Sequence, residues 1–165
     1  MSNPQSRDDL GIALLSVGIV IAVVATLLPV VQFRGGSGMM SLTTWQILPW
    51  FTKLKLVALA LLMAAAFLPQ LEKWRLSIAA VAILMVFIPA VSSFISAVYA
   101  WGSVRADIVR LSGQRSPFVH PGIGNAVLVF GALLVGAGVW RIEQVKARLA
   151  GAAAGQDRAA QTAGA

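Results

Sequence analysis

Long apolar stretches separated by short polar segments dominate this chain. The apolar runs cover residues 10–33, 47–68, 76–103 and 122–140, and an α-helix needs roughly 20 residues to cross a bilayer. The pattern predicts an all-α integral membrane protein built as a four-transmembrane-helix bundle. We expect this domain to occupy residues 1–150 and a disordered tail rich in Ala and Gly to follow over residues 151–165.

The longest run contains Pro89, which removes one backbone N–H and predicts a kink in the helix. Ser92, Ser96 and Ala100 follow at intervals of four and therefore share one helix face. Small residues on a shared face allow a neighbouring helix to approach closely in lipid. A kinked helix with serines also suits the lining of a substrate path, and both interpretations stay open.

The first and fourth runs show the same spacing of small residues. Gly18, Ala22 and Thr26 lie four apart in the first run, and Ala132 and Gly136 lie four apart in the fourth. We expect both sets to form faces for helix packing.

The second run begins with two lysines, Lys53 and Lys55. The charge-free part that follows them is about 13 residues long, which is too short to cross a bilayer unaided. We therefore expect both lysines to extend toward the headgroups beside Trp50. Residues 69–75 then form a tight turn, so the second and third spans are expected to be antiparallel neighbours.

Two segments outside the runs also predict local structure. Residues 30–33 favour a strand, residues 35–38 are a glycine-rich turn and a second strand leads to Trp45, which together predict a short outer β-hairpin; a flexible loop is the alternative. In residues 104–121, apolar positions share one face of a helix and charged positions lie elsewhere. This pattern is typical of a short amphipathic helix at a membrane interface.

Composition agrees with a membrane protein, because 58% of the 165 residues are hydrophobic and only 12% are charged. The net charge of +7 comes from cations beside apolar runs, so we expect contact with the lipid bilayer and no nucleic acid. The sequence has no cysteine, which excludes disulfides and thiolate metal sites.

The cations also predict the orientation. Seven lysines and arginines lie on the side of the two termini and six on the other side, and Trp74 with Arg75 and Trp140 with Arg141 lie on the first side. We therefore expect a multi-pass protein of the plasma (inner) membrane with both termini in the cytoplasm.

Few residues are candidates for catalysis or metal binding. His120 is the only histidine, and it has no cysteine or acidic cluster near it in the sequence, so no metal site is expected. The sequence shows no paired carboxylates, nucleophile elbow or phosphate loop, so we expect no catalytic residue, no cofactor and no enzyme activity. Asn125 lies one turn into the fourth run, where it suits a helix cap, a bond to a serine of the third span, or a cavity lining.

Two groups of residues are the candidates for function. Those for helix packing or a substrate path are Pro89, Ser92, Ser96, Asn125 and Gly136. Those for contact with lipid headgroups form an outward basic set of Lys53, Lys55, Arg105, Arg110 and Arg115.

The layout also resembles known families. A first span ending in LLPVV, a Gly- and Ser-rich hairpin ending at Trp45, a second span ending in AAAFLPQLE and a fourth span opening with PGIGNAVLVFGALL resemble the tetraspan plan of claudin- and stargazin-like proteins and of the membrane modules of the paraquat-inducible protein A family. The chain lacks the zinc ribbons of the latter and the first-loop signature of claudins. The resemblance therefore implies the four-span plan and transfers no functional residue.

We expect no buried ionisable group in the spans, and the sequence offers several small-residue faces. This combination favours a non-catalytic accessory or scaffold subunit of a membrane or envelope complex, whose partners are other membrane subunits or a second copy of the chain. Lipid or small-hydrophobe handling is the alternative, because Pro89, the serines, Asn125 and the outward basic set also suit a transport path.

Overall fold

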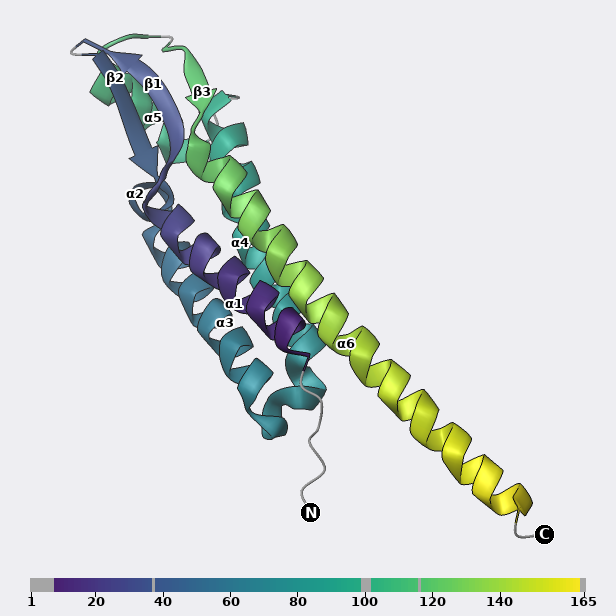
Figure 1. Cartoon of the computed structure of the whole chain (residues 1–165). Coiled ribbons are helices and arrows are strands. Elements are labelled where there is room, and N and C mark those ends of the chain that lie inside the picture. Colours follow the sequence, from purple (N-terminus) through teal and green to yellow (C-terminus); the bar gives the residue numbers. More distant parts are fainter. Residues whose placement is uncertain (1–7, 37, 99–101, 116, 164–165) are drawn as a thin grey trace.

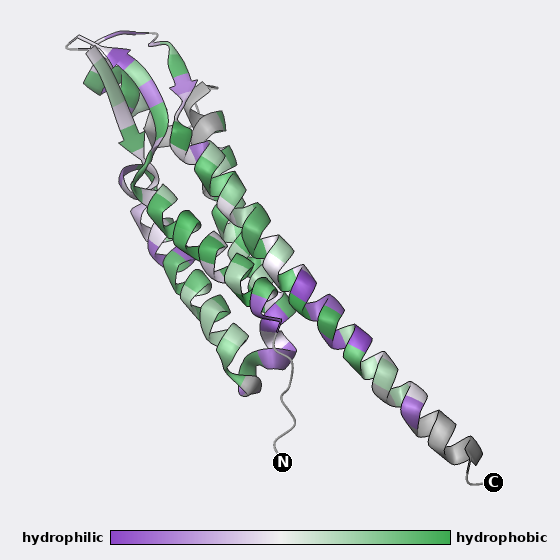
Figure 2. Cartoon of the chain, in the orientation of Figure 1, coloured by the Kyte–Doolittle hydropathy of each residue, from purple (hydrophilic) through white to green (hydrophobic). Residues whose placement is uncertain are grey.

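The computed structural model describes residues 8–36, 38–98, 102–115 and 117–163. Within this part, four helices are long and apolar enough to span a membrane, by length and composition, which is the number of such helices that the sequence predicts. They are α1 (Asp9–Val24), continued by the 3-10 turn η1 (Ala25–Leu27), α3 (Pro49–Phe67), α4 (Arg75–Val98) and α6 (Ile123–Ala163). The helices lie along one another (Figure 1), and hydrophobic residues cover most of their shared length (Figure 2).

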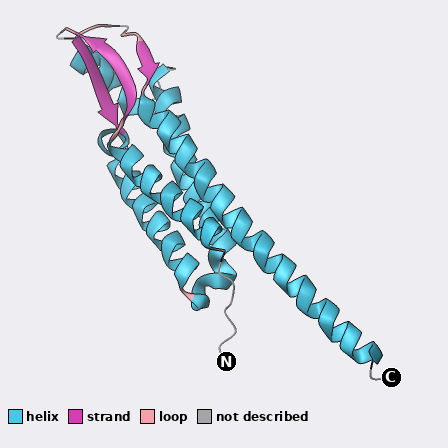
Figure 3. Ribbon diagram, viewed as in Figure 1, coloured by secondary structure: helices cyan, strands magenta, loops and turns pink. Residues whose placement is uncertain are grey.

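The two ends of this bundle differ in structure (Figure 3). One end, called the sheet end below, carries the β-strands together with the short helices α2 (Thr44–Ile47) and α5 (Gly102–Ser112). The opposite end, called the turn end, carries Asp8 at the start of α1, the 3-10 turn η2 (Pro69–Trp74) and the region where α6 leaves the bundle.

The predicted hairpin is confirmed, and it belongs to a larger sheet. Strands β1 (Pro29–Gly35) and β2 (Gly38–Thr43) pair antiparallel, and Gly38 at the turn has a φ of 127°, in the left-handed region that favours glycine. Strand β3 (Val119–Pro121) pairs antiparallel with the other edge of β1, so the described strands have the order β2-β1-β3. The sequence did not predict β3, because a three-residue strand has too little pattern of its own.

Local sequence explains where the second span begins. Thr43 and Gln46 form a capping box, in which the Thr43 backbone N–H donates to Oε1 of Gln46 at 2.9 Å and Thr43 Oγ1 accepts from the Gln46 backbone N–H. Pro49 then takes the first position of α3, where its missing N–H costs nothing. The helix ends at Phe67, two residues before Pro69.

Helices α1 and α6 pack against each other at backbone distance. A Cβ added to Gly18 would lie 2.7 Å from the backbone N of Val135, and one added to Gly138 would lie 2.6 Å from the backbone N of Leu15. Both distances are shorter than real Cβ contacts, so only glycine fits at these positions. The expected face of Gly18, Ala22 and Thr26 is confirmed as buried.

The expected face of α6 is only partly correct. Ala132 is buried, but Gly136 is half-buried, and a Cβ added to Gly136 would meet only Cδ1 of Ile83 at an ordinary 3.8 Å. The close contact uses Gly131 and Gly138, which lie two helical turns apart on a neighbouring face. The choice between these faces depends on where α1 lies, which the spacing of small residues does not reveal.

Helix α6 is longer than the sequence predicts. We expect the fourth span to end at residue 140, its helix to continue to residue 150 and a disordered tail to begin at residue 151, whereas α6 is one helix of 41 residues that ends at Ala163. At 1.5 Å per residue it is roughly 60 Å long, and its last part leaves the bundle (Figure 1). Alanine, the strongest helix former, is frequent in this last part.

The third apolar run is helical through Pro89 as part of α4, and the kink predicted there is not tested by these bounds. The amphipathic helix expected after it is present as α5. Its apolar residue Ile108 is fully buried in the common core, and α5 packs against α4 and β1. The cap at the sheet end therefore consists of the three strands and α5.

Candidate functional site

The burial of Lys55 in α3 is the least expected feature of the structure. Its side chain is 0% exposed, and its Nζ has no hydrogen-bond partner among the described residues. Lys53 is exposed, and its Nζ lies 4.6 Å from the centre of the Trp50 ring. Lys53 is therefore free to extend outward as expected, whereas the side chain of Lys55 is enclosed by the bundle.

The helical period explains the difference between the two lysines. The buried positions of α3 include Thr52, Lys55, Leu59 and Leu62, which are separated by three and four residues and so form its inward face. Lys53 lies off this face. This spacing is visible in the sequence, but two charges near the start of an apolar run also suit the edge of a span.

Two threonines near the start of α3 are also buried. Thr44 and Thr52 are both fully buried, and Thr52 Oγ1 donates a hydrogen bond to the backbone oxygen of Thr44 at 3.2 Å. Thr52 precedes Lys55 by three residues on the inward face of α3, whereas Oγ1 of Thr44 has no partner within the described part of the chain. We call Thr44, Thr52 and Lys55 the threonine–lysine cluster.

A second polar group joins the sheet to α6. The backbone oxygen of Val30 accepts a hydrogen bond from the backbone N–H of Gly122 at 2.9 Å and another from Nδ2 of Asn125 at 2.7 Å. The register of the β1–β2 pair shifts between Pro29 and Val31, so Val30 lies in a bulge. Asn125 thus holds a strand to a helix, and of the interpretations left open for it, contact with the described serines of α4 is not the one observed.

Glycine is required at the same joint. A Cβ added to Gly122 would lie 2.1 Å from the backbone oxygen of Pro29, and one added to Gly124 would lie 2.8 Å from it. The Gly-Ile-Gly-Asn segment is therefore a structural joint between β1 and the start of α6. It explains why this segment contains two glycines separated by a single residue.

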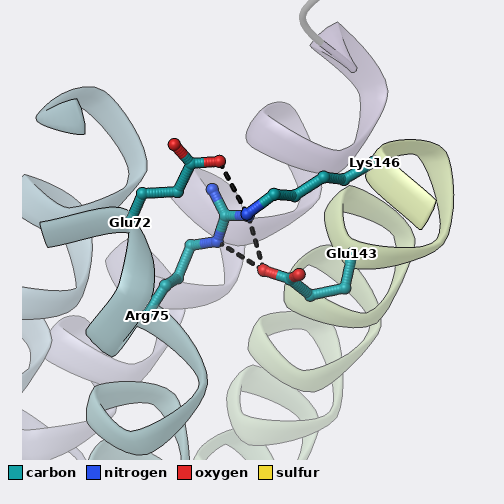
Figure 4. Close-up of polar contacts among 4 residues, drawn as sticks. All are labelled: Glu72, Arg75, Glu143 and Lys146. Atoms are coloured by element: carbon teal, nitrogen blue, oxygen red, sulfur yellow. Dashed lines mark hydrogen bonds and ion pairs between the residues drawn. The ribbon is translucent and has the colours of Figure 1, made fainter. Parts of the chain in front are cut away.

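The turn end holds α6 by ion pairs, two of which are drawn in Figure 4. Nε of the buried Arg75 donates to Oε1 of Glu143 at 2.9 Å, and Nζ of Lys146 lies 2.8 Å from Oε1 of Glu72. Nε of Arg141 lies 3.1 Å from a carboxylate oxygen of Asp8. Each pair joins α6 to a different segment, namely α4, η2 and the residue before α1.

The other candidate residues are dispersed. Arg105 donates from Nη1 to the backbone oxygen of Pro117 at 3.3 Å, whereas Arg110 and Arg115 are exposed. The outward basic set is therefore not a single patch, because Lys55 is buried elsewhere. Ser92 is half-buried, and the side chains of Pro89 and Ser96 lie outside the described part of the structure.

His120 lies in β3, where it is exposed and its ring centre is 4.6 Å from that of Phe118. Among the residues that the structure describes, no three His, Asp or Glu side chains form a group able to hold a metal ion.

These features define a class of protein. It is a bundle of helices of membrane-spanning length, capped by a small sheet at one end, extended by a single helix at the other, and with a buried lysine near the cap. No protein-family model, curated protein or solved structure matches this chain.

Proposed function

We propose that the protein is a non-catalytic, multi-pass membrane protein that serves as an accessory or scaffold subunit of a larger membrane complex. The length of α6 is the observation that supports this function. A helix of roughly 60 Å is about twice as long as the hydrocarbon core of a bilayer, which is about 30 Å thick. The part that leaves the bundle, residues 147–163, is called the α6 arm below.

The ion pairs at the turn end support the same function. Arg75 with Glu143 and Lys146 with Glu72 hold α6 at the point where it leaves the bundle. The direction of the α6 arm is therefore tied to the positions of α4 and η2. The α6 arm leaves the bundle (Figure 1), and most helices in proteins gain their stability from packing. A partner that packs along the α6 arm would therefore stabilise it.

We further propose that the bundle spans the plasma (inner) membrane with the termini in the cytoplasm and the sheet outside. Exposed tryptophans support two membrane boundaries, since Trp45 and Trp50 lie at the sheet end and Trp74 and Trp140 at the turn end. Exposed apolar side chains cover the helices between these levels, as expected of a surface that faces lipid.

Native mass spectrometry of the protein, extracted gently from its own membrane, tests the scaffold function. We expect the full chain to carry another membrane subunit, or a second copy of itself, in a fixed ratio. A chain truncated after Ala150 should lose that partner and keep the folded bundle. A full chain that is always monomeric and yields no crosslinked partner would contradict the proposal.

Lipid or small-hydrophobe handling is a second proposed function, favoured by the threonine–lysine cluster. The sequence-based preference for a scaffold relied on the absence of buried charge, and the burial of Lys55 corrects that premise. Ionisable side chains inside a membrane bundle are rare and are associated with ligand or ion paths.

A further inference from the structure

We propose that the threonine–lysine cluster binds an anionic oxygen group carried by an amphiphile, either the phosphate of a phospholipid or the carboxylate of a fatty acid. This site goes beyond the scaffold function, and it rests on the lipid-handling function, to which it assigns a position and a ligand class.

The threonine–lysine cluster has hydrogen-bond donors that lack an acceptor. A lysine ammonium has three donors and no acceptor, and the hydroxyl of Thr44 has a donor as well. Both groups are buried, and neither has a hydrogen-bond partner among the described residues. A buried ammonium without a partner is costly, whereas an anionic oxygen beside it forms a charge-assisted hydrogen bond.

The chain itself offers no carboxylate for this role at the sheet end. Asp107 is exposed on α5. Glu72, Glu143 and Asp8 pair with cations at the turn end. The remaining acidic residues in the sequence are Asp9, at the start of α1 on the turn end, and Asp157, in the α6 arm. A negative charge for Lys55 must therefore come from another molecule.

The depth of Lys55 matches an amphiphile. Lys55 follows Pro49, the first residue of α3, by six residues, which is roughly 9 Å along the helix axis. Trp50 at the start of α3 is 76% exposed, as expected of a side chain at headgroup level. The acid group of an amphiphile lies near this level, and the flexible lysine stem allows Nζ to meet it.

Lys53 provides a matched control within the same helix turn. It carries the same charge, but it is exposed and lies over the ring of Trp50. Loose attraction of anionic lipid to the protein surface would depend on Lys53 at least as much as on Lys55. A specific site depends on Lys55 alone.

Ligand titration of the full chain in a neutral detergent, followed by native mass spectrometry, tests the proposal. The probes are phosphatidylglycerol, oleate and inorganic phosphate, and the variants are Lys55→Met and Lys53→Met. We expect one bound phosphatidylglycerol or oleate per chain, an affinity at least tenfold lower for Lys55→Met, and little change for Lys53→Met. Preference for one probe identifies the acid group as phosphate or carboxylate.

The folding of the variant is checked by its melting temperature. Lys55→Met replaces an unpaired buried ammonium by an apolar side chain of similar length, so the ligand-free variant should melt at a higher temperature than the wild type. Added phosphatidylglycerol or oleate should raise the melting temperature of the wild type and of Lys53→Met, but not that of Lys55→Met. Lys55→Arg, which keeps the charge, should retain part of the binding.

The result that would reject the Lys55 site differs from the result that would reject lipid handling altogether. Unchanged lipid affinity in Lys55→Met would overturn this site and leave lipid handling at another position. A wild-type chain that binds neither lipid probe would overturn both. Inorganic phosphate that binds to Lys55 as tightly as the lipids would overturn the assignment of an amphiphile.

Discussion

Among the residues that the structure describes, the two cations Arg75 and Lys55 are buried, and only Arg75 has a partner. Arg75 donates to Glu143, so its charge is compensated within the chain. Lys55 has no such partner among the described residues. A buried ion pair holds helices in register but adds little net stability, whereas an uncompensated buried charge persists where it serves a ligand. The paired residue is structural, and the unpaired residue is the candidate for function.

The two ion pairs of Figure 4 allow a test at the scale of single residues. Glu143→Ala should lower the free energy of unfolding by about 3 kcal/mol, because it leaves the buried Arg75 without a partner. Glu72→Ala removes a pair whose two side chains are 43% and 51% exposed, and should cost less than about 1 kcal/mol. Equilibrium unfolding in mixed micelles measures both values. Equal losses for the two variants would show that burial of Arg75 does not matter.

At the scale of elements, backbone contacts made through glycine determine how the parts join. Gly18 and Gly138 bring α1 and α6 together, and Gly122 with Asn125 attaches the start of α6 to β1. Such contacts leave no room for a side chain, so they specify one arrangement of neighbouring elements. The sheet is therefore held to the same helix that forms the α6 arm.

Adding one methyl group distinguishes the two glycine faces of α6. Gly138→Ala should destabilise the protein by about 1–3 kcal/mol, because the new Cβ would overlap the backbone of α1 at Leu15. Gly136→Ala meets only Ile83 at ordinary distance, so the better helix propensity of alanine should leave stability unchanged or raise it by up to about 1 kcal/mol. Thermal unfolding in detergent measures the change in stability of both variants. A destabilised Gly136→Ala variant would instead support the packing face of Ala132 and Gly136 that the sequence predicts.

The joint between the sheet and α6 has its own test. In Gly122→Ala the Cβ would collide with the backbone oxygen of Pro29, so β3 and the start of α6 should separate from β1, at a cost of about 2 kcal/mol. Gly36→Ala is the control, since nothing lies within 4 Å of a Cβ at that position. Hydrogen exchange of the β1 backbone amides should become faster in the first variant only. Unchanged exchange would mean that the sheet does not depend on this joint.

At the scale of the whole molecule, the two ends present different surfaces. The sheet end carries the cap, whose exposed cations include Arg34, Arg110 and Arg115. The turn end carries the α6 arm together with ion pairs that compensate Arg75, Arg141 and Lys146. In a membrane, these two surfaces would meet different compartments and hence different partners.

The absence of cysteine from the sequence makes the orientation simple to measure. Gly36→Cys places a thiol at the hairpin and Gly151→Cys places one in the α6 arm, and both positions are open. A membrane-impermeant maleimide added to intact cells should label only Gly36→Cys, and both variants should react after lysis. The opposite pattern would place the sheet in the cytoplasm and contradict the proposed orientation.

Local patterns along the chain were enough to predict the parts of the protein that depend on neighbouring residues. The four helices of membrane-spanning length, the hairpin, the amphipathic helix α5 and the small-residue face at Gly18 all follow from periodicity, apolar length and turn chemistry within one segment. The continuation of α6 to Ala163 is also local, because alanine favours helix, but the polar composition of that segment was given more weight.

Other features depend on which elements meet in space. Strand β3 exists because β1 offers it an edge, and Gly138 rather than Gly136 is critical because α1 lies on that face. Lys55 differs from Lys53 because the rest of the bundle covers one face of α3 and not the other. A sequence records what each segment prefers, whereas the identity of its neighbours follows only when all segments are packed together. The proposed ligand site, which depends on the burial of one lysine, belongs to this second kind.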